Sequence, residues 1–374
     1  MIQAGMSDFS LILKNDWNRT LSSLSSLTDL GATARTFKAF RRRRGIASEE
    51  TLLRMCLGYG AGLSLRQASA WAEAADLADV SSPALQRRLS NAADWLEHLA
   101  KLLLEEAQAQ PAGEWINRRI RLVDATSLSH PGAKGTTWRL HVSYDVTGRI
   151  DDFQLSNAKG AESLARFAWR KGDIAVADRG YAKAKDLRMV IDAGGDLAVR
   201  IGWNALRLTD GHGDPFDLFA ALKAVKDKPV DVSASVDTRE KGRSPLPVRL
   251  LMTRLPEDKA EAARKKIKAK AARQGKETDP RSLEAAGYVI VLTSLPGDYS
   301  AEAILRLYRL RWQIELLFKR MKSLLDFGEL PAKSDGLAKT WIFSKLIIAL
   351  LAEKMARQVA ESSPSAPCNC PSGD

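Results

Sequence analysis

The segment between Tyr308 and Lys322 carries a row of polar side chains. If the segment is one α-helix, with about 100° between residues, the row falls within roughly 80° of arc. It consists of Tyr308, Arg311, Glu315, Lys319 and Lys322. A carboxylate can bind a metal ion, and neighbouring cations and a phenol can bind phosphates. The row therefore predicts phosphoryl transfer on a nucleic acid.

An ordinary ion-pairing surface is the alternative interpretation of this row. Glu315 follows Arg311 by four residues and precedes Lys319 by four. Pairs at this spacing stabilise a helix by only ~0.2–0.5 kcal/mol and need no ligand. The functional interpretation therefore requires further acidic residues elsewhere in the chain.

Two aspartates supply them, because each follows a short apolar run with strand character. Asp124 follows Ile120–Val123, and Asp178 follows Ile174–Ala177. The carboxyl ends of strands in an open α/β sheet are where catalytic groups collect. With Glu315, these carboxylates would offer oxygen ligands to two Mg²⁺ ions in phosphodiester transfer.

Four other aspartates compete with this pair. Asp145, Asp151 and Asp152 flank or open a hairpin around Thr147-Gly148, where aspartate is common. Asp173 precedes its strand and lies at the opposite end from Asp178. A single aspartate at a strand end would be an ordinary turn residue, so only the set of three carboxylates supports a site.

The element pattern predicts an α/β protein with a ribonuclease-H-like core. The expected domains are an N-terminal helical DNA-binding domain (1–112), an initial core segment (113–202), a β-rich insertion (203–297), a closing core segment with the Tyr308–Lys322 helix (298–358) and a disordered tail (359–374). Within them we expect a turn through Gly58, Gly60 and Gly62, one helix over 84–103 capped by the Ser81-Ser82 pair, and a helix over 160–169.

The N-terminal domain contains a helix, a turn and a second helix that carries Gln86, Arg87 and Arg88. This pattern is compatible with a helix-turn-helix that contacts DNA, and the run Arg41–Arg44 could neutralise phosphates. A plain helical bundle is the alternative.

Charge and cysteine content narrow the class of protein. The 374 residues carry a formal charge of +12, which favours a polyanionic partner, nucleic acid before membrane. Cys56 is expected in a core, and Cys368 and Cys370 lie in the polar tail, without zinc-ligand spacing.

We see no signal peptide, and the apolar run 341–355 is short and contains Lys345. A cytoplasmic, nucleoid-associated protein is expected.

The spacing Tyr308-x2-Arg311-x3-Glu315-x6-Lys322 resembles the YREK signature of bacterial DDE transposases of insertion-sequence family four. LVDATSL and ADRGY are similar to the motifs that carry that family's first two acids. The resemblance covers roughly residues 40–355. It implies a ribonuclease-H-like core with a β insertion and cut-and-paste DNA transposition.

The same resemblance implies roles for individual residues. Asp124, Asp178 and Glu315 would be the catalytic ligands of two Mg²⁺ ions, for which Mn²⁺ can substitute. Tyr308, Arg311 and Lys322 would contact phosphates at the cleaved end, with Lys319 beside them and Arg87 and Arg88 as further DNA contacts. The implied partners are the inverted repeats at the transposon ends, target DNA and a second copy of the chain in a synaptic complex.

Two other functions fit the residues less completely. One is a decayed, repressor-like copy that binds DNA without catalysis, and the other is a structure-specific nuclease on the same core. Some relatives use a tryptophan of the insertion to contact a flipped base, but no motif around Trp203 matches, and a core role is expected for it.

Overall fold

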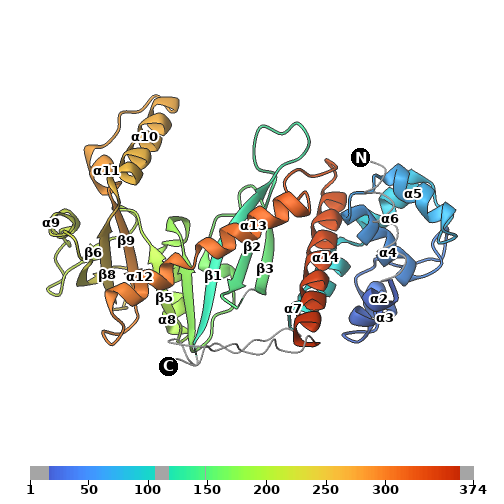
Figure 1. The fold of residues 1–374 in the computed structure, drawn as a ribbon, viewed down its shortest axis with the longest axis horizontal. Helices are drawn as coiled ribbons and strands as arrows, with labels where there is room; N and C mark the ends of the chain where they lie inside the picture. Colours follow the sequence, from blue (N-terminus) through green and yellow to red (C-terminus); the bar gives the residue numbers. More distant parts are fainter. Residues whose placement is uncertain (1–16, 106–117, 148, 363–374) are drawn as a thin grey trace, which may run out of the picture. The chain divides into compact units, whose positions relative to one another are not determined.

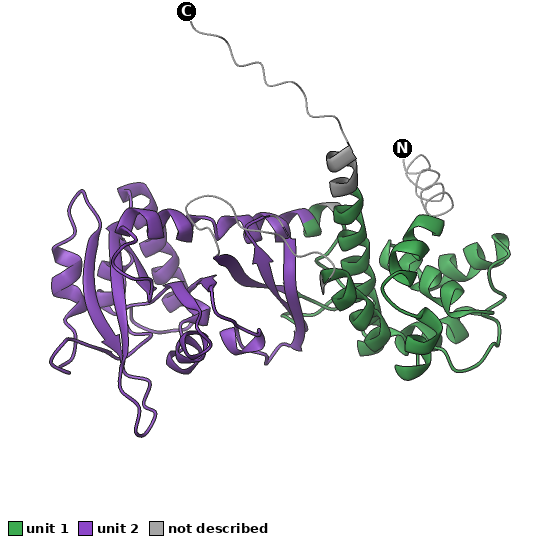
Figure 2. Ribbon diagram, turned by 90° about the horizontal axis from the view of Figure 1, so that it is seen from below, with its two compact units in different colours: residues 1–108, 128–136, 321–374 green, residues 109–127, 137–320 purple. Residues whose placement is uncertain are grey.

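The computed structural model describes residues 17–105, 118–147 and 149–362. The predictions for Gly148, for Cys368 and Cys370 and for the tail beyond residue 362 concern residues outside this description. The chain divides into two compact units (Figure 2). One comprises residues 1–108, 128–136 and 321–374, and the other residues 109–127 and 137–320.

The second unit is mixed α/β, as the sequence predicts (Figure 1). Its strands are β1 (Arg119–Leu128), β2 (Trp138–Asp145), β3 (Arg149–Asn157), β4 (Asp173–Ala177), β5 (Asp196–Arg200), β6 (Leu208–Thr209), β7 (Val230–Val236), β8 (Leu246–Arg254) and β9 (Tyr288–Thr293). Its helices are α8 (Ala184–Asp192), α9 (Leu218–Lys223), α10 (Glu257–Arg273), α11 (Pro280–Ala285), α12 (Ala301–Arg309) and α13 (Trp312–Leu324), with 3-10 turns η2 (Leu164–Arg166) and η3 (Arg179–Tyr181).

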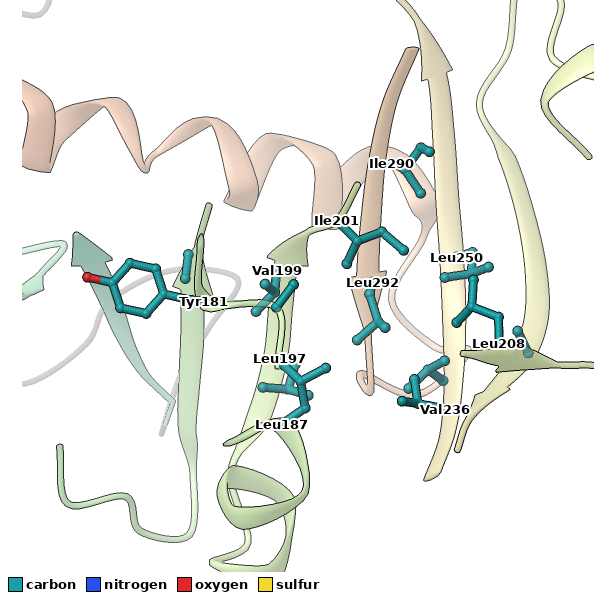
Figure 3. Packing of buried hydrophobic residues seen from close by; sticks show 14 of the residues in the cluster. Tyr181, Leu187, Leu197, Val199, Ile201, Leu208, Val236, Leu250, Ile290 and Leu292 are labelled. Atoms are coloured by element: carbon teal, nitrogen blue, oxygen red, sulfur yellow. The ribbon is translucent and has the colours of Figure 1, made fainter. Parts of the chain in front are cut away.

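These strands form one sheet in the order β3-β2-β1-β4-β5-β9-β8-β7-β6. β2 and β3 pair as an antiparallel hairpin, and β1, β4 and β5 run parallel. The β-rich segment extends the same sheet, because β9 pairs antiparallel with β5. One apolar cluster runs under these strands, from Tyr181 and Leu187 through Leu197 and Leu292 to Leu250 (Figure 3). The strands near the predicted catalytic aspartates and the β-rich segment therefore share a core.

A buried ion network fixes the amino ends of β1 and β4. Arg119 contacts Asp173 and Asp151 at 2.7 and 2.8 Å. Arg121, only 2% exposed, contacts Asp151 at 2.7 Å and Asp173 at 3.3 Å, and its guanidinium lies 4.4 Å from the Trp169 ring. Asp173 thus neutralises buried arginines, which explains why an aspartate lies at this end of the strand.

The described residues of the first unit are mostly helical. They form α2 (Trp17–Ser25), α3 (Leu30–Thr36), α4 (Glu49–Gly60), α5 (Leu65–Ala74), α6 (Ser82–Ser90), α7 (Ala93–Glu105) and α14 (Asp335–Ser362). Cys56 is buried, as predicted, and burial raises the pKa of its thiol. No helix within the described residues is long and apolar enough to cross a membrane.

Two local predictions in this unit fail: the turn expected through Gly58, Gly60 and Gly62, of which only Gly62 lies after the helix, and the single helix 84–103. Gly58 and Gly60 belong to helix α4, and a Cβ on Gly60 would lie 2.4 Å from Ser344 Cβ on α14, so the glycine permits a close helix contact. The predicted helix 84–103 is interrupted at Asn91 between α6 and α7. The predicted helix start is confirmed, because Ser81 is the N-cap residue of α6 and Pro83 lies in its first turn, although the Ser81 side chain makes no capping hydrogen bond.

Two helix predictions in the second unit also fail. Over 160–169 only the 3-10 turn η2 forms, because Asp186 of α8 accepts hydrogen bonds from the Leu164 amide and the Ser163 hydroxyl. The segment 308–322 is two helices: Leu310 and Arg311 bond to carbonyls three residues back, which ends α12 and tightens the turn before α13. The segment contains no glycine or proline to signal this break.

Replacing Asp173 by asparagine should destabilise the protein strongly. The change leaves Arg121 with reduced charge compensation in a buried site, and loss of one partner of a buried pair costs about 3–5 kcal/mol. Chemical denaturation of both proteins measures the difference. Asp192→Asn, which breaks the partly exposed pair with Arg243, is the control and should change little. Similar stabilities of the Asp173 variant and the wild type would contradict the prediction.

Candidate active site

Asp124 and Asp178 lie side by side in the sheet. The parallel pairing of β1 with β4 ends at Val123 opposite Ala177, and each aspartate is the next residue. Asp178 directly follows β4, as predicted. Asp124 does not end its strand, because β1 continues to Leu128; it ends only the stretch paired with β4. The register therefore brings the two carboxylates to the same edge of the β1–β4 pair.

Two side chains from the α12–α13 region contact these aspartates. Tyr308 Oη donates a hydrogen bond to Asp178 Oδ1 at 3.3 Å. Arg311 Nη1 lies 3.6 Å from Asp124 Oδ2, and Arg311 Nη2 donates to Glu315 Oε1 at 2.6 Å. The structure thus brings five of the predicted site residues together. Arg311 forms the (i, i+4) pair that the alternative interpretation expected, and it also bridges to the first aspartate.

Glu315 is linked to Asp124 through its contact with Arg311. Its side chain is 47% exposed, against 16% for Arg311. Across the described residues, no three Asp, Glu, His or Cys side chains lie close enough together to hold a metal ion. Lys319 and Lys322 are exposed and follow Glu315 on α13 at positions i+4 and i+7, the same face of the helix.

Burial raises the pKa of Asp124 to about 6. The Ala125 amide and Arg311 act in the opposite direction, and the negative charges of Glu162 and Asp178 add to the increase. Burial and the charge of Asp178 also raise the pKa of Tyr308, so the phenol keeps its proton. Although burial opposes it, the surrounding negative charge raises the pKa of Arg311. Asp124 is therefore a desolvated carboxylate near other negative charges, an environment that favours a bound cation.

Three buried polar atoms next to these carboxylates have no hydrogen-bond partner among the described residues: Tyr181 Oη, Arg200 Nε and Arg311 Nε. The Tyr181 hydroxyl points away from the labelled apolar side chains (Figure 3), and Asp124 and Glu162 act on its pKa, which burial raises. Unsatisfied buried groups are rare in proteins and indicate a missing ligand or water. These donors fit an anionic ligand such as a phosphate, and the partly buried carboxylate of Asp124 fits a cation.

Comparison with known proteins identifies the family. The family described as Transposase DDE domain matches residues 115–351. The chain belongs to the DDE transposases. It is 39% identical over 357 residues to the putative transposase InsL of insertion sequence IS186A from Escherichia coli K12, with 94% of this chain and 96% of that protein covered. The Escherichia coli transposase of IS421 is equally similar over 358 residues, again with 94% and 96% covered.

A more distant relative is the transposase of IS231F from Bacillus thuringiensis subsp. israelensis. It is 25% identical over 295 residues, which cover 69% of this chain and 61% of that protein. The chain is thus an insertion-sequence transposase, an enzyme of the polynucleotidyl-transferase type that acts on DNA, from a family that uses divalent metal ions. Neither the repressor-like copy nor the nuclease is favoured.

Two charged residues that lie beside these carboxylates were not predicted from the sequence. Arg200 is the last residue of β5, and its Nη1 lies 4.0 Å from Asp178 Oδ1. Glu162 lies so close to the ADRGY segment that a Cβ on Gly180 would be 1.6 Å from Glu162 Oε2. Arg200 could have been found, because it ends the strand beside β4. Glu162 lies in a segment that was expected to be a helix, so its position gave no signal.

Other predicted DNA contacts of the transposase lie in the helical unit. Gln86 and Arg87 on α6 are exposed. Arg88 is partly buried, and its Nη2 donates to the carbonyls of Arg42 and Arg44 at 2.6 and 3.1 Å. Arg88 therefore holds the Arg41–Arg44 run against α6.

Trp203 of the transposase packs inside the β-rich segment. Its ring lies 4.5 Å from the Arg281 guanidinium and 5.7 Å from the Phe219 ring, and its Nε1 donates to Ser282 Oγ at 3.1 Å. Because both the ring and the N–H have partners, these contacts agree with the packing role expected for this residue.

Asp124→Asn should stabilise the metal-free transposase at pH 7 by about 1–3 kcal/mol. The folded protein holds the Asp124 proton up to about pH 6, whereas the unfolded chain releases it near pH 4. The stabilising contribution of this group is therefore complete below pH 4 and is lost as the pH rises to about 6.

Denaturant unfolding of both proteins between pH 4 and pH 7, in the presence of a chelator, measures this difference. The advantage of the variant should grow over that interval and then level off. A constant difference at all pH values, or a wild type that is more stable at pH 7, would show that Asp124 is not destabilised by burial. Asp145→Asn, at the end of the hairpin strand β2, serves as the control.

Proposed function

We propose that this protein is a cut-and-paste transposase of insertion-sequence family four, which hydrolyses DNA at the ends of its element and joins the freed 3′-OH to target DNA. One observation carries the proposal. Asp124 and Asp178 occupy matched positions on paired strands, and Tyr308 and Arg311 from the YREK segment contact them. Glu315 joins the cluster through Arg311. Motifs that are separated by more than a hundred residues thus meet in one place.

The sheet supports a ribonuclease-H-like core. The order β3-β2-β1-β4-β5, with a hairpin beside three parallel strands, is the arrangement that this proposal requires. We propose that the β-rich insertion runs over 203–297 and that the chain then returns to the core through α12 and the start of α13. The expected closing core segment 298–358 is divided, because the residues from 321 onward belong to the helical unit. A helical DNA-binding domain (1–112) and the initial core segment (113–202) precede the insertion.

Asp124, Asp178 and Glu315 would hold Mg²⁺, most simply two ions, with Mn²⁺ as a substitute. Bound there, the metal would activate the attacking oxygen and stabilise the leaving oxygen. Carboxylates are the ligands that Mg²⁺ prefers, and a buried carboxylate with a raised pKa favours a cation beside it. Arg311 contacts two of these carboxylates, and its charge offsets theirs.

The cations and the phenol of the YREK segment would hold DNA phosphates at the cleaved end. Arg311 offers a planar fork that matches a phosphate, and Tyr308 a protonated hydroxyl. Lys322, with Lys319 beside it, is an exposed point charge on α13. None of these side chains needs to change its protonation state to bind phosphate.

The helical unit would bind the inverted repeats. Arg87 is exposed on α6, and Arg88 holds the basic run Arg41–Arg44 beside it. Because two ends must be cut and joined together, we propose that a homodimer forms on DNA in a synaptic complex. The enzyme would act at the nucleoid.

Asp178→Asn and Glu315→Gln should each reduce metal-dependent end cleavage by at least about a hundred-fold, because a lost metal ligand removes several kcal/mol of transition-state stabilisation. Binding of the same end duplex, measured in calcium, should change little. The assay uses purified protein, Mg²⁺ or Mn²⁺ and a duplex that carries the element's own inverted repeat.

Asp151→Asn tests a partly buried carboxylate of the ion network outside the site. Asp145→Asn tests a partly exposed carboxylate at the end of β2, and this variant should cleave at the wild-type rate. Cleavage by the Asp178 and Glu315 variants at the wild-type rate would refute the assigned roles.

Lys322→Gln should weaken end binding without affecting folding. The side chain is exposed, so its replacement leaves the core intact, and loss of one phosphate contact lowers the slope of log K against log salt by about 1. Fluorescence anisotropy over a salt series measures the slope, and thermal unfolding controls for the fold. An unchanged slope would remove Lys322 from the DNA-contact surface.

A further inference from the structure

Helix α10 is the most concentrated cationic element of the α/β unit, and neither the family signature nor the site explains it. Residues 262–276 contain seven basic residues and no acidic one. The acidic residues of the helix, Glu257, Asp258 and Glu261, all lie near its amino end, where negative charge favours the helix dipole. The charge of α10 is therefore segregated along its length.

The helix has an inner apolar face and an outer cationic face. At about 100° per residue, Lys265, Lys266, Lys270 and Arg273 fall within about 140° of arc, and all four are exposed. Ala260 is buried, and Ala263, Ile267 and Ala271 are partly buried on the opposite side. We call the four exposed cations the α10 cationic face.

This face lacks internal compensation. Arg264 pairs with Glu257 at 2.6 Å and donates to Leu283 O of α11 at 3.4 Å, so it belongs to the inner side. Among the residues that the structure describes, Lys265, Lys266 and Lys270 have no acidic partner within 4.0 Å. Lys266 and Lys270 are like charges at (i, i+4), which destabilise an isolated helix. An external polyanion would remove that repulsion.

The outer face also indicates which polyanion fits. Within residues 262–273, the other residues on this arc are Ala262 and Ala269, so this part of the face has no large apolar side chain to enter a lipid surface. Small residues between long cations let a duplex backbone approach the helix closely. Figure 1 shows α10 standing beyond the ends of β8 and β9, away from β1.

We propose that the α10 cationic face binds the phosphate backbone of double-stranded DNA, independently of sequence and apart from the carboxylate site. It would hold duplex next to the segment being cut or joined. This inference rests on the proposed function for its biological setting, but the binding itself does not depend on cleavage.

The test compares two triple variants of the full-length protein. Lys265→Gln/Lys266→Gln/Lys270→Gln neutralises the face while keeping similar helix propensity. Lys223→Gln/Lys226→Gln/Lys228→Gln removes the same charge from exposed lysines in and after α9. Binding to a random-sequence duplex of about 30 base pairs, a length of about three helical turns, is measured between about 50 and 200 mM salt.

For the α10 variant, the slope of log K against log salt should be smaller by about 2.7, because three phosphate contacts are lost and each contributes about 0.9. The affinity advantage of the wild type should therefore shrink by about 40-fold between about 50 and 200 mM salt. The α9 variant should keep a near wild-type slope. An unchanged slope for the α10 variant, or an equal loss in both variants, would overturn the proposal, as would stronger binding of the wild type to anionic phospholipid vesicles than to DNA.

Metal-dependent cleavage of a saturating end duplex at low salt separates the two proposals. The α10 variant should cleave at the wild-type rate once bound. If the wild type cleaves no end duplex with Mg²⁺ or Mn²⁺ yet shows the α10-dependent slope, the proposed catalytic function fails and the α10 inference stands. If the wild type cleaves the end duplex but the α10 variant has the wild-type slope, the proposed catalytic function stands and the α10 inference fails.

Discussion

The parallel register between β1 and β4 is the constraint on which the site depends. It pairs Arg119 with Asp173 at one end and Val123 with Ala177 at the other, so the two catalytic candidates emerge together. A slip of one residue would turn alternate side chains to the opposite face of the sheet. The ion network of Arg119, Arg121, Asp151 and Asp173 opposes such a slip, because it would leave buried charges unpaired. Asp173, at the amino end of β4, thus helps to fix the register that places Asp124 and Asp178 together at the other end.

Charge balance links this pair to the YREK segment. Arg311 contacts Asp124 and Glu315, and Arg200 approaches Asp178. In the proposed function, Asp124, Asp178 and Glu315 would hold the metal ion, and Arg311 would contact a phosphate. The same guanidinium would therefore serve both the carboxylates and the phosphate.

The extension of the sheet gives the β-rich segment a defined position. Because β9 pairs with β5 and the apolar cluster is continuous, helices α10 and α11 are carried on strands that share the core with β4 and β5. The exposed charges of α10 therefore lie on a helix that is attached to the core, and they do not enter the core themselves. Trp203 contributes by packing between Arg281 and Phe219.

The sequence by itself determined the mixed α/β class, the hairpin of β2 and β3, the apolar strands that precede Asp124 and Asp178, and the three carboxylate motifs. Alternation and apolar runs depend on neighbouring residues, and the YREK spacing is a local pattern. The sequence could not reveal that β1 continues beyond Asp124, that residues 160–169 form no α-helix, or that α12 and α13 are separate helices. Asp186 competes for the Leu164 amide and Ser163 hydroxyl, and a tightened turn places Arg311 between two carboxylates. Only the tertiary structure decided these features, because contacts between distant residues outweigh local helix preference.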